Sequence, residues 1–359
     1  SDIGIFYEKV GRPILYNRSM RDTFNRTILA AAAFLWLAGA AAAAATDVLV
    51  IGGGASGTTA AIQAARLGAR VLVLEPTPWL GGMLTSAGVS ATDGDNRLPA
   101  GLWGEFRDRL RAHYGGAAAL ETGWVSNTLF EPSVGAAVFR EMLAREKNTE
   151  VWYGASFSSI KRDRDGWLVT VRRGGRQESV RAVVLIDATE LGDAAAACGA
   201  AYDTGMEARA ATGEAIAPEK ANGIIQDLTY VAVLKDYGPG ADRTVPAPAG
   251  YDPSMFYCSC ISTKCAHPRE GKRLSPCDKM LTYGRLPGGK YMINWPIEGN
   301  DYYADVISLP PERREAALRP AKDVTLGFVR YIQTELGHRN LGLADDEFPT
   351  PDRLPFIPY

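Results

Sequence analysis

The fold of this chain is decided by Asp47-Val48-Leu49-Val50-Ile51-Gly52-Gly53-Gly54-Ala55-Ser56-Gly57. The first five residues, apolar after Asp47, are typical of a buried parallel strand, and residues 58–67 predict a helix that ends before Gly68. Residues 70–74 form a second apolar strand, which ends in Glu75. A strand, a glycine-rich turn, a helix and a second strand with a terminal acid make up a dinucleotide-binding unit.

The residues of this turn have separate expected roles. Gly52 permits a tight turn, Gly54 lets the backbone approach a pyrophosphate, and Gly57 lets the helix pack closely on the strand. The pyrophosphate then meets the helix N-terminus, where backbone N–H groups point outward. Glu75 is placed to accept hydrogen bonds from ribose hydroxyls. The alternative, a chance glycine-rich loop, does not account for the order of strand, helix and acid. The predicted turn comprises Gly52, Gly53, Gly54, Ala55, Ser56 and Gly57.

Length and charge limit the class of protein. A chain of 359 residues is long enough for two ordinary domains and a large core. The net charge is −2, with 22% charged residues, and no basic cluster indicates a nucleic-acid partner.

The segment Met20–Ala45 has the three parts of a signal peptide. Arg21 and Arg26 form a basic region, residues 28–37 an apolar region, and the alanine tract that follows offers small-residue cleavage sites. The alternative is a retained membrane anchor, because residues 28–45 carry no charge. We favour cleavage, since the first core strand follows almost at once. The mature protein is then expected to start near Thr46, to be periplasmic or secreted, and not to stay inserted in a membrane.

Four cysteines, Cys258, Cys260, Cys265 and Cys277, fall within 20 residues. In an oxidising compartment they predict two disulfides, and Cys258 and Cys260 are too close to pair with each other. A metal or iron–sulfur site and free thiols are the alternatives, although the spacing matches neither the usual zinc pattern nor the ferredoxin runs. Cys198 stands apart and is expected to be a small buried hydrophobic residue.

The rest of the sequence predicts two domains, followed by a short segment in which the chain starts to return to the first domain. A strand at 150–153, a meander at 158–164, 167–171 and 178–181, and a return strand at 182–186 complete the first domain. Beyond residue 204 the chain is rich in Pro and Gly, with strands expected at 229–234 and 290–295 and helices at 311–319 and 324–336. We therefore expect an upstream segment and signal peptide over 1–45, a nucleotide-binding domain over 46–204, a substrate domain over 205–345 and a truncated return over 346–359.

These stretches resemble the FAD-dependent oxidoreductase family that is related to the flavin subunit of heterodisulfide reductase and built like glutathione reductase. The matching residues are 47–57, Glu75 with 80–85, 187–193, and more loosely 347–349 with 358–359. The resemblance implies an α/β fold, with a Rossmann-type FAD-binding domain, an inserted β-meander and a mixed α+β substrate domain. It also implies a closing segment of the FAD domain after Tyr359, so the chain is expected to be a fragment.

The resemblance carries further residues to the cofactor. Gly81, Gly82 and Met83 would line the pyrophosphate and ribityl path, and Ala188 and Thr189 would contact the cofactor where the return strand ends. Asp193 would either reach the same site or cap the following helix.

The sequence indicates no catalytic base, because the flavin itself accepts the electrons. His113 and His338 are expected at the surface, whereas His267 lies in the cysteine loop, where a ligand role is an option.

The sequence supports three functional hypotheses. The leading hypothesis is an exported FAD-dependent oxidoreductase that oxidises a small organic substrate and passes electrons to an unidentified acceptor. The first alternative is a subunit that relays electrons from FAD to an iron–sulfur centre, as in heterodisulfide reductase. The second is a degenerate flavin-fold module that binds without catalysis.

Overall fold

The computed structural model describes residues 4–7, 13–16, 43–268 and 273–359. The chain divides into two compact units, Ser1–Ala44 and Ala45–Tyr359. In the first unit, β1 (Gly4–Tyr7) pairs with β2 (Pro13–Tyr16) in an antiparallel hairpin. Residues 20–42 of the expected signal peptide lie outside the described residues. None of the described helices is long and apolar enough to cross a membrane.

The second unit contains a six-stranded sheet in the order β5-β4-β3-β8-β7-β6. The three strands β3, β4 and β5 are parallel, whereas β6, β7 and β8 form the expected antiparallel meander. This mixed α/β architecture with a parallel-strand sheet confirms the predicted fold class. The strands are β3 (Ala44–Ile51), β4 (Val71–Glu75), β5 (Thr149–Tyr153), β6 (Ala155–Asp163), β7 (Gly166–Arg173) and β8 (Arg176–Asp187).

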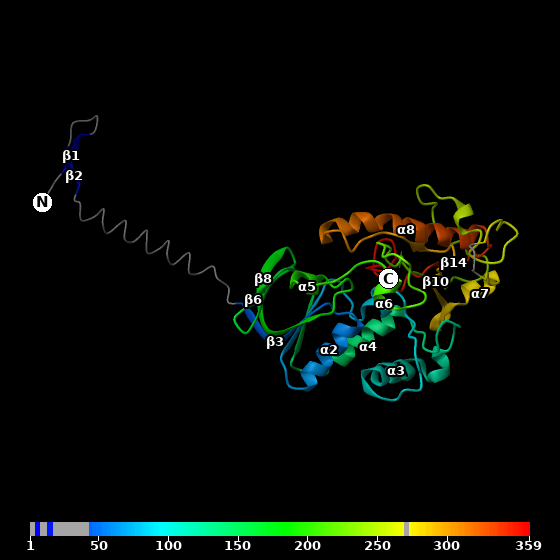
Figure 1. Cartoon of the computed structure of the whole chain (residues 1–359), viewed down its shortest axis with the longest axis horizontal. Helices are drawn as coiled ribbons and strands as arrows, with labels where there is room; N and C mark the ends of the chain where they lie inside the picture. Colours follow the sequence, from blue (N-terminus) through cyan, green and yellow to red (C-terminus); the bar gives the residue numbers. More distant parts are fainter. Residues whose placement is uncertain (1–3, 8–12, 17–42, 269–272) are drawn as a thin grey trace. The chain divides into compact units, whose positions relative to one another are not determined.

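Both faces of β4 and of the second half of β3 are buried, which explains their apolar runs. Val48 and Val50 belong to the core under the helices, whereas Leu49 and Ile51 belong to the core under the meander. This alternation is the two-residue period of a strand. The helices that cover the first face are α2 (Ala55–Arg66), α3 (Gly101–Tyr114) and α4 (Pro132–Ala144), of which α2 and α4 lie side by side (Figure 1).

The meander differs from the prediction in one respect. The sequence predicts separate strands at 178–181 and 182–186, but β8 is a single strand over Arg176–Asp187. The residues around Arg181 and Ala182 include no glycine or proline that would break the strand. The chain therefore continues from its pairing with β7 to its place beside β3.

A second, antiparallel sheet has the order β11-β12-β10-β14, and α8 (Pro311–Thr334) packs against it. Phe328, Val329 and Ile332 of α8 share a core with Leu234 and Ile293 of the sheet. The strands of this part of the chain are β9 (Leu228–Thr229), β10 (Ala232–Asp236), β11 (Gly284–Leu286), β12 (Lys290–Ile293), β13 (Asp301–Tyr302) and β14 (Leu341–Leu343).

The two helices expected at 311–319 and 324–336 form one helix, α8 (Pro311–Thr334), with Pro320 inside it. A proline in a helix removes one backbone hydrogen bond. The helix nevertheless continues past Pro320, and Ala321 and Thr325 beyond it are fully buried. The short helices are η1 (Gly82–Leu84), η2 (Ala117–Leu120), α5 (Asp193–Ala197), α6 (Arg209–Thr212), η3 (Pro253–Phe256), α7 (Cys277–Leu281) and η4 (Pro287–Gly289).

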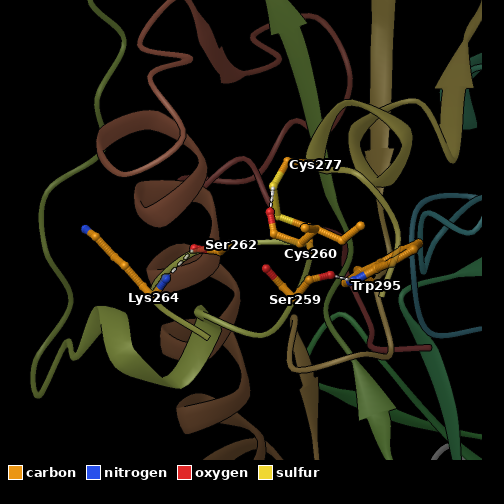
Figure 2. Close-up of a disulfide and its surroundings, with 7 residues drawn as sticks. Ser259, Cys260, Ser262, Lys264, Cys277 and Trp295 are labelled. Carbon is orange, nitrogen blue, oxygen red and sulfur yellow. Dashed lines mark hydrogen bonds between the residues drawn. A yellow bond between two sulfur atoms is a disulfide. The ribbon is translucent and has the colours of Figure 1, made fainter. Parts of the chain in front are cut away.

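Two disulfides form within the cysteine loop, as predicted. Cys258 is bonded to Cys265, and Cys260 is bonded to Cys277, which settles the connectivity that the sequence left open. Figure 2 shows the second bond beside Trp295, whose indole N–H donates to the Ser259 carbonyl over 2.7 Å. Cys260 is fully buried in the core beneath α8, so this bond anchors the loop to that core.

The expectation for Cys198 is wrong, because this residue is exposed. It follows the short helix α5, in which only Ala194 is buried. A helix with so little buried surface leaves its carboxyl end in solvent.

Replacing both Cys260 and Cys277 by alanine should lower the free energy of unfolding by about 2–4 kcal/mol, because the open loop gains entropy in the unfolded chain. Urea unfolding monitored by circular dichroism measures this change. The control, Cys198→Ser, should stay within about 0.5 kcal/mol of the parent, since its side chain is exposed. Equal stability of the double variant and the parent would contradict a structural role for this bond.

Candidate cofactor-binding site

Three segments meet at the carboxyl ends of β3, β4 and β8, the edge at which open α/β sheets bind ligands. The segments are 52–57, 81–83 and 188–190. Backbone hydrogen bonds connect them: Gly81 N–H donates to Gly53 O over 2.8 Å, and Ala188 N–H donates to Ile51 O over 2.8 Å. The structure therefore brings together the three stretches that the sequence singled out.

The turn after β3 has room for backbone only. Gly52 has a φ of +99°, and a Cβ there would lie 2.1 Å from the Ala188 carbonyl oxygen. A Cβ on Gly57 would lie 2.0 Å from the Gly52 carbonyl oxygen. Both contacts are far shorter than van der Waals distance, so glycine at these positions lets α2 dock directly on the turn. The tight turn and the close packing predicted for these residues are confirmed.

Gly54 is less tightly enclosed than Gly52 and Gly57. A Cβ there would meet nothing nearer than Glu190 Oε1, at 3.2 Å. Gly54 is the N-cap of α2, and its residue type supplies no side chain to cap the helix. Among the described residues, none accepts a hydrogen bond from the amides of Ala55, Ser56 or Gly57. These amides and the helix dipole make this end of α2 suited to an anion.

Glu75 ends β4 and is buried beside the turn. Its Oε2 accepts from Gly53 N–H over 2.8 Å and its Oε1 from Thr77 N–H over 2.7 Å. Burial raises the pKa of Glu75 to about 6, although the hydrogen bonds from Thr77 and Gly53 favour the charged form. The carboxylate is therefore mostly ionised at neutral pH, and each oxygen keeps a lone pair that could accept from a ribose hydroxyl.

The second glycine pair lies against the first turn. Gly81 has a φ of +110° and Gly82 a φ of +52°. A Cβ on Gly82 would lie 2.8 Å from the Gly54 Cα, so the two turns approach each other backbone to backbone. Met83 follows in η1 with a partly exposed side chain. The juxtaposition agrees with a path for an extended cofactor past residues 81–83, a role that stays a prediction.

Asp187 organises the third segment, a role that the sequence analysis missed. Its Oδ1 accepts from the backbone and the hydroxyl of Thr189, at 2.8 and 2.7 Å. Its Oδ2 accepts from Ala195 N–H over 2.7 Å and so caps α5. The Thr189 hydroxyl also accepts from Asp193 N–H over 2.8 Å. These bonds hold Ala188 in its contact with Gly52.

Asp193 does not cap α5, because the N-cap is Gly192 and Asp187 supplies the capping bond. Its carboxylate instead forms two hydrogen bonds with the Arg314 guanidinium of α8, at 2.6 and 2.8 Å. Such a two-pronged pair is geometrically specific. It connects the loop after β8 to α8. Nothing in the sequence around Arg314 signals this partner.

A buried ion cluster was also missed. Lys290 Nζ lies 2.6 Å from Glu131 Oε1 and 2.7 Å from Glu347 Oε1, and both Lys290 and Glu347 are buried. Burial alone would lower the pKa of Lys290, but its hydrogen bonds to the two glutamates outweigh burial and raise it. Burial raises the pKa of Glu347. The cluster connects β12, the start of α4 and the tail that follows β14.

The remaining candidates do not form a second site. Among the described residues, no group of His, Cys, Asp or Glu, with or without His267, is arranged to hold a metal ion. Four of the five cysteines are in disulfides, which leaves no cysteine set for an iron–sulfur cluster. His113 is exposed, as expected, and His338 is half-buried.

A surface cavity of about 410 Å³ lies between α3 and α4 and is lined by Arg109, His113, Ser133 and Glu141 among others. None of its lining residues belongs to the three converging segments. It is therefore separate from the glycine turns.

Comparison with known proteins gives one family match. The model of a family described as FAD dependent oxidoreductase matches residues 47–359. No curated protein is significantly similar to this chain.

Matches to solved structures are partial. BexE, described in connection with oxidation during BE-7585A biosynthesis, is 17% identical with a TM-score of 0.41, and the match covers 77% of this chain and 48% of that one. The p-nitrophenol 4-monooxygenase PnpA of Pseudomonas putida is 17% identical with a TM-score of 0.33, covering 54% and 49%. A flavoprotein/dehydrogenase of Cytophaga hutchinsonii is 18% identical with a TM-score of 0.34, covering 53% and 46%. This chain thus spans about half the length of each.

The buried carboxyl group of Glu75 should make stability depend on pH. Its pKa in the folded protein, about 6, lies above its ordinary value of 4.5, so the folded state binds this proton more tightly than the unfolded chain. The stabilisation is therefore present below pH 4.5 and is lost as the pH rises to 6, a change of about 1–2 kcal/mol.

Urea unfolding of the parent and Glu75→Gln across this pH range measures the effect. The free energy of unfolding of the parent minus that of the variant should fall as the pH rises. For the control Glu121→Gln, at an exposed glutamate, the free energy of unfolding of the parent minus that of the variant should not change with pH. A Glu75 difference that is flat or rises with pH would show that the carboxyl group is not penalised by burial.

Proposed function

The chain belongs to the FAD-dependent oxidoreductase family, and we propose that it is an exported enzyme that oxidises a small organic substrate through FAD bound at the converging glycine turns. One observation carries the assignment of the site. The turn 52–57 and the turn 81–83 meet at the amino end of α2, where the backbone N–H groups of the first turn of the helix have no protein acceptor among the described residues.

The residues at this edge fit the parts of FAD. The pyrophosphate fits over Gly54. An added Cβ would meet an atom within 3 Å at the other three glycines of the turn, Gly52, Gly53 and Gly57, but not at Gly54. The adenosine ribose fits beside Glu75, whose two oxygens face the turn through their bonds to Gly53 and Thr77. Gly81, Gly82 and Met83 would line the path toward the flavin, with Ala188 and Thr189 on its other side.

When bound, FAD supplies the group that accepts a hydride or electrons from the substrate. The residues of this chain bind and orient it. Amides of Ala55, Ser56 and Gly57 provide fixed donors for phosphate oxygens, and their positions do not need to change because the turn is locked by Gly52 and Gly57. Glu75, ionised at neutral pH, accepts from hydroxyl groups and thereby favours a ribose over a group without donors.

Export is supported by two features. The segment Met20–Ala45 has the composition of a signal peptide. The two disulfides of the loop at 258–277 are typical of proteins in an oxidising compartment. We therefore propose a periplasmic or secreted protein whose mature form begins near Thr46.

The substrate would be handled by residues 205–345, and a separate acceptor would take the electrons from the flavin. A relay to an iron–sulfur centre is less well supported, since the clustered cysteines are bonded to one another. A degenerate module without cofactor is also less well supported, because the glycine contacts that a cofactor requires are intact. Iron content and the visible absorption spectrum distinguish these possibilities.

Replacing Gly54 by valine should weaken FAD binding at least tenfold, or by about 1.4 kcal/mol, because a branched side chain would fill the approach of the pyrophosphate. Flavin released from the purified protein and titration with FAD measure the effect. The control is Gly223→Val, at a glycine whose added Cβ would meet nothing within 4 Å. A Gly54→Val protein that binds FAD like the parent would remove this assignment of the site.

A further inference from the structure

Glu190 lies where the two glycine turns meet. Its Oε1 would be 2.5 Å from a Cβ on Gly82 and 3.2 Å from a Cβ on Gly54. The same Cβ position on Gly82 is 3.7 Å from the Ala55 amide nitrogen. The carboxylate of Glu190 thus sits over the backbone of both turns, close to the amino end of α2.

This carboxylate has no countercharge. In the part of the chain that the structure describes, Glu190 forms no ion pair and no side-chain hydrogen bond, and desolvation alone shifts its pKa. The first turn of α2 and residues 81–83 carry no charged side chain. The charged group that faces it from a neighbouring strand is Glu75, whose pKa is raised in part by the charge of Glu190.

The other charged groups of the loop are engaged elsewhere. Asp187 accepts from Thr189 and Ala195, and Asp193 is paired with Arg314. Glu190 is therefore a free negative charge beside the amides and helix dipole that we assign to the pyrophosphate.

We propose that Glu190 competes with the pyrophosphate of FAD for the amino end of α2 and so limits FAD affinity. This inference rests on the proposed FAD site. Two anions cannot share a few ångströms of a single helix end without a large repulsion. Binding of FAD then requires that the Glu190 side chain turns aside or takes up a proton.

A pH dependence follows. Glu190 as a residue is exposed, but its carboxylate lies against the two turns, and this partial desolvation raises the pKa of Glu190 above that of an ordinary glutamate. Protonation of Glu190 removes the repulsion and strengthens FAD binding as the pH falls. Protonation of Glu75 acts in the opposite direction, because a protonated carboxyl group is a poorer acceptor for ribose hydroxyls. The contribution of Glu190 is therefore read from the difference between parent and variant.

The test is FAD titration of the flavin-free chain at pH 5 and pH 8, followed by flavin fluorescence. Glu190→Gln removes the charge at nearly constant size, and Glu190→Ala removes both charge and bulk. At pH 8 each should bind FAD about five- to fiftyfold more tightly than the parent. At pH 5 the difference from the parent should become smaller. Glu121→Gln, at an exposed glutamate, is the control for a general change of net charge.

Unchanged or weaker FAD binding by both Glu190 variants at pH 8 would overturn the proposal. Gly54→Val is measured in the same series to separate this failure from failure of the proposed function. If Gly54→Val loses FAD while the Glu190 variants bind like the parent, the site stands and the role of Glu190 is wrong. If Gly54→Val binds FAD like the parent, the proposed site itself is wrong.

Discussion

The close contact between α2 and the turn after β3 is the constraint on which the rest of this structure depends. With no side chain at Gly52 or Gly57, the first turn of the helix rests on the Gly52 carbonyl, and the Ala188 carbonyl reaches the same turn from β8. Any larger residue would push the helix or β8 away. The contact fixes the amino end of α2 at the carboxyl edge of the parallel strands, where its free amides can receive an anion.

The surrounding polar groups extend from this contact. Glu75 braces the turn through Gly53, and Asp187 holds the loop that carries Ala188 and Glu190. Asp193 then connects this loop to α8 through Arg314, while Lys290 joins β12 to α4 and the tail. A family that oxidises its substrates through FAD needs the cofactor and the substrate-handling residues in a fixed relation. The partly buried Asp193–Arg314 pair and the buried cluster at Lys290 connect elements that belong to the two sheets.

Sequence alone predicted the features that depend on neighbours in the chain. Strands β3 and β4, helix α2 and the contacts of Gly52 and Gly57 follow from local periodicity and from the lack of a side chain. The two disulfides were predicted from the cysteine spacing and the expected oxidising compartment. Contacts between distant segments were not predictable in this way. The pairing of Asp193 with Arg314, the position of Glu190 and the continuity of α8 through Pro320 depend on packing that no local pattern encodes.

Hydrogen–deuterium exchange of the backbone amides shows whether FAD binds across the turns at 52–57 and 81–83. Exchange is compared for the full chain with and without saturating FAD. With FAD bound, the amides of residues 55–57, 82 and 83 should become strongly protected, because no acceptor for them is found among the described residues and the ligand would supply one. Protection confined to other segments, with these amides unchanged, would contradict binding across these turns.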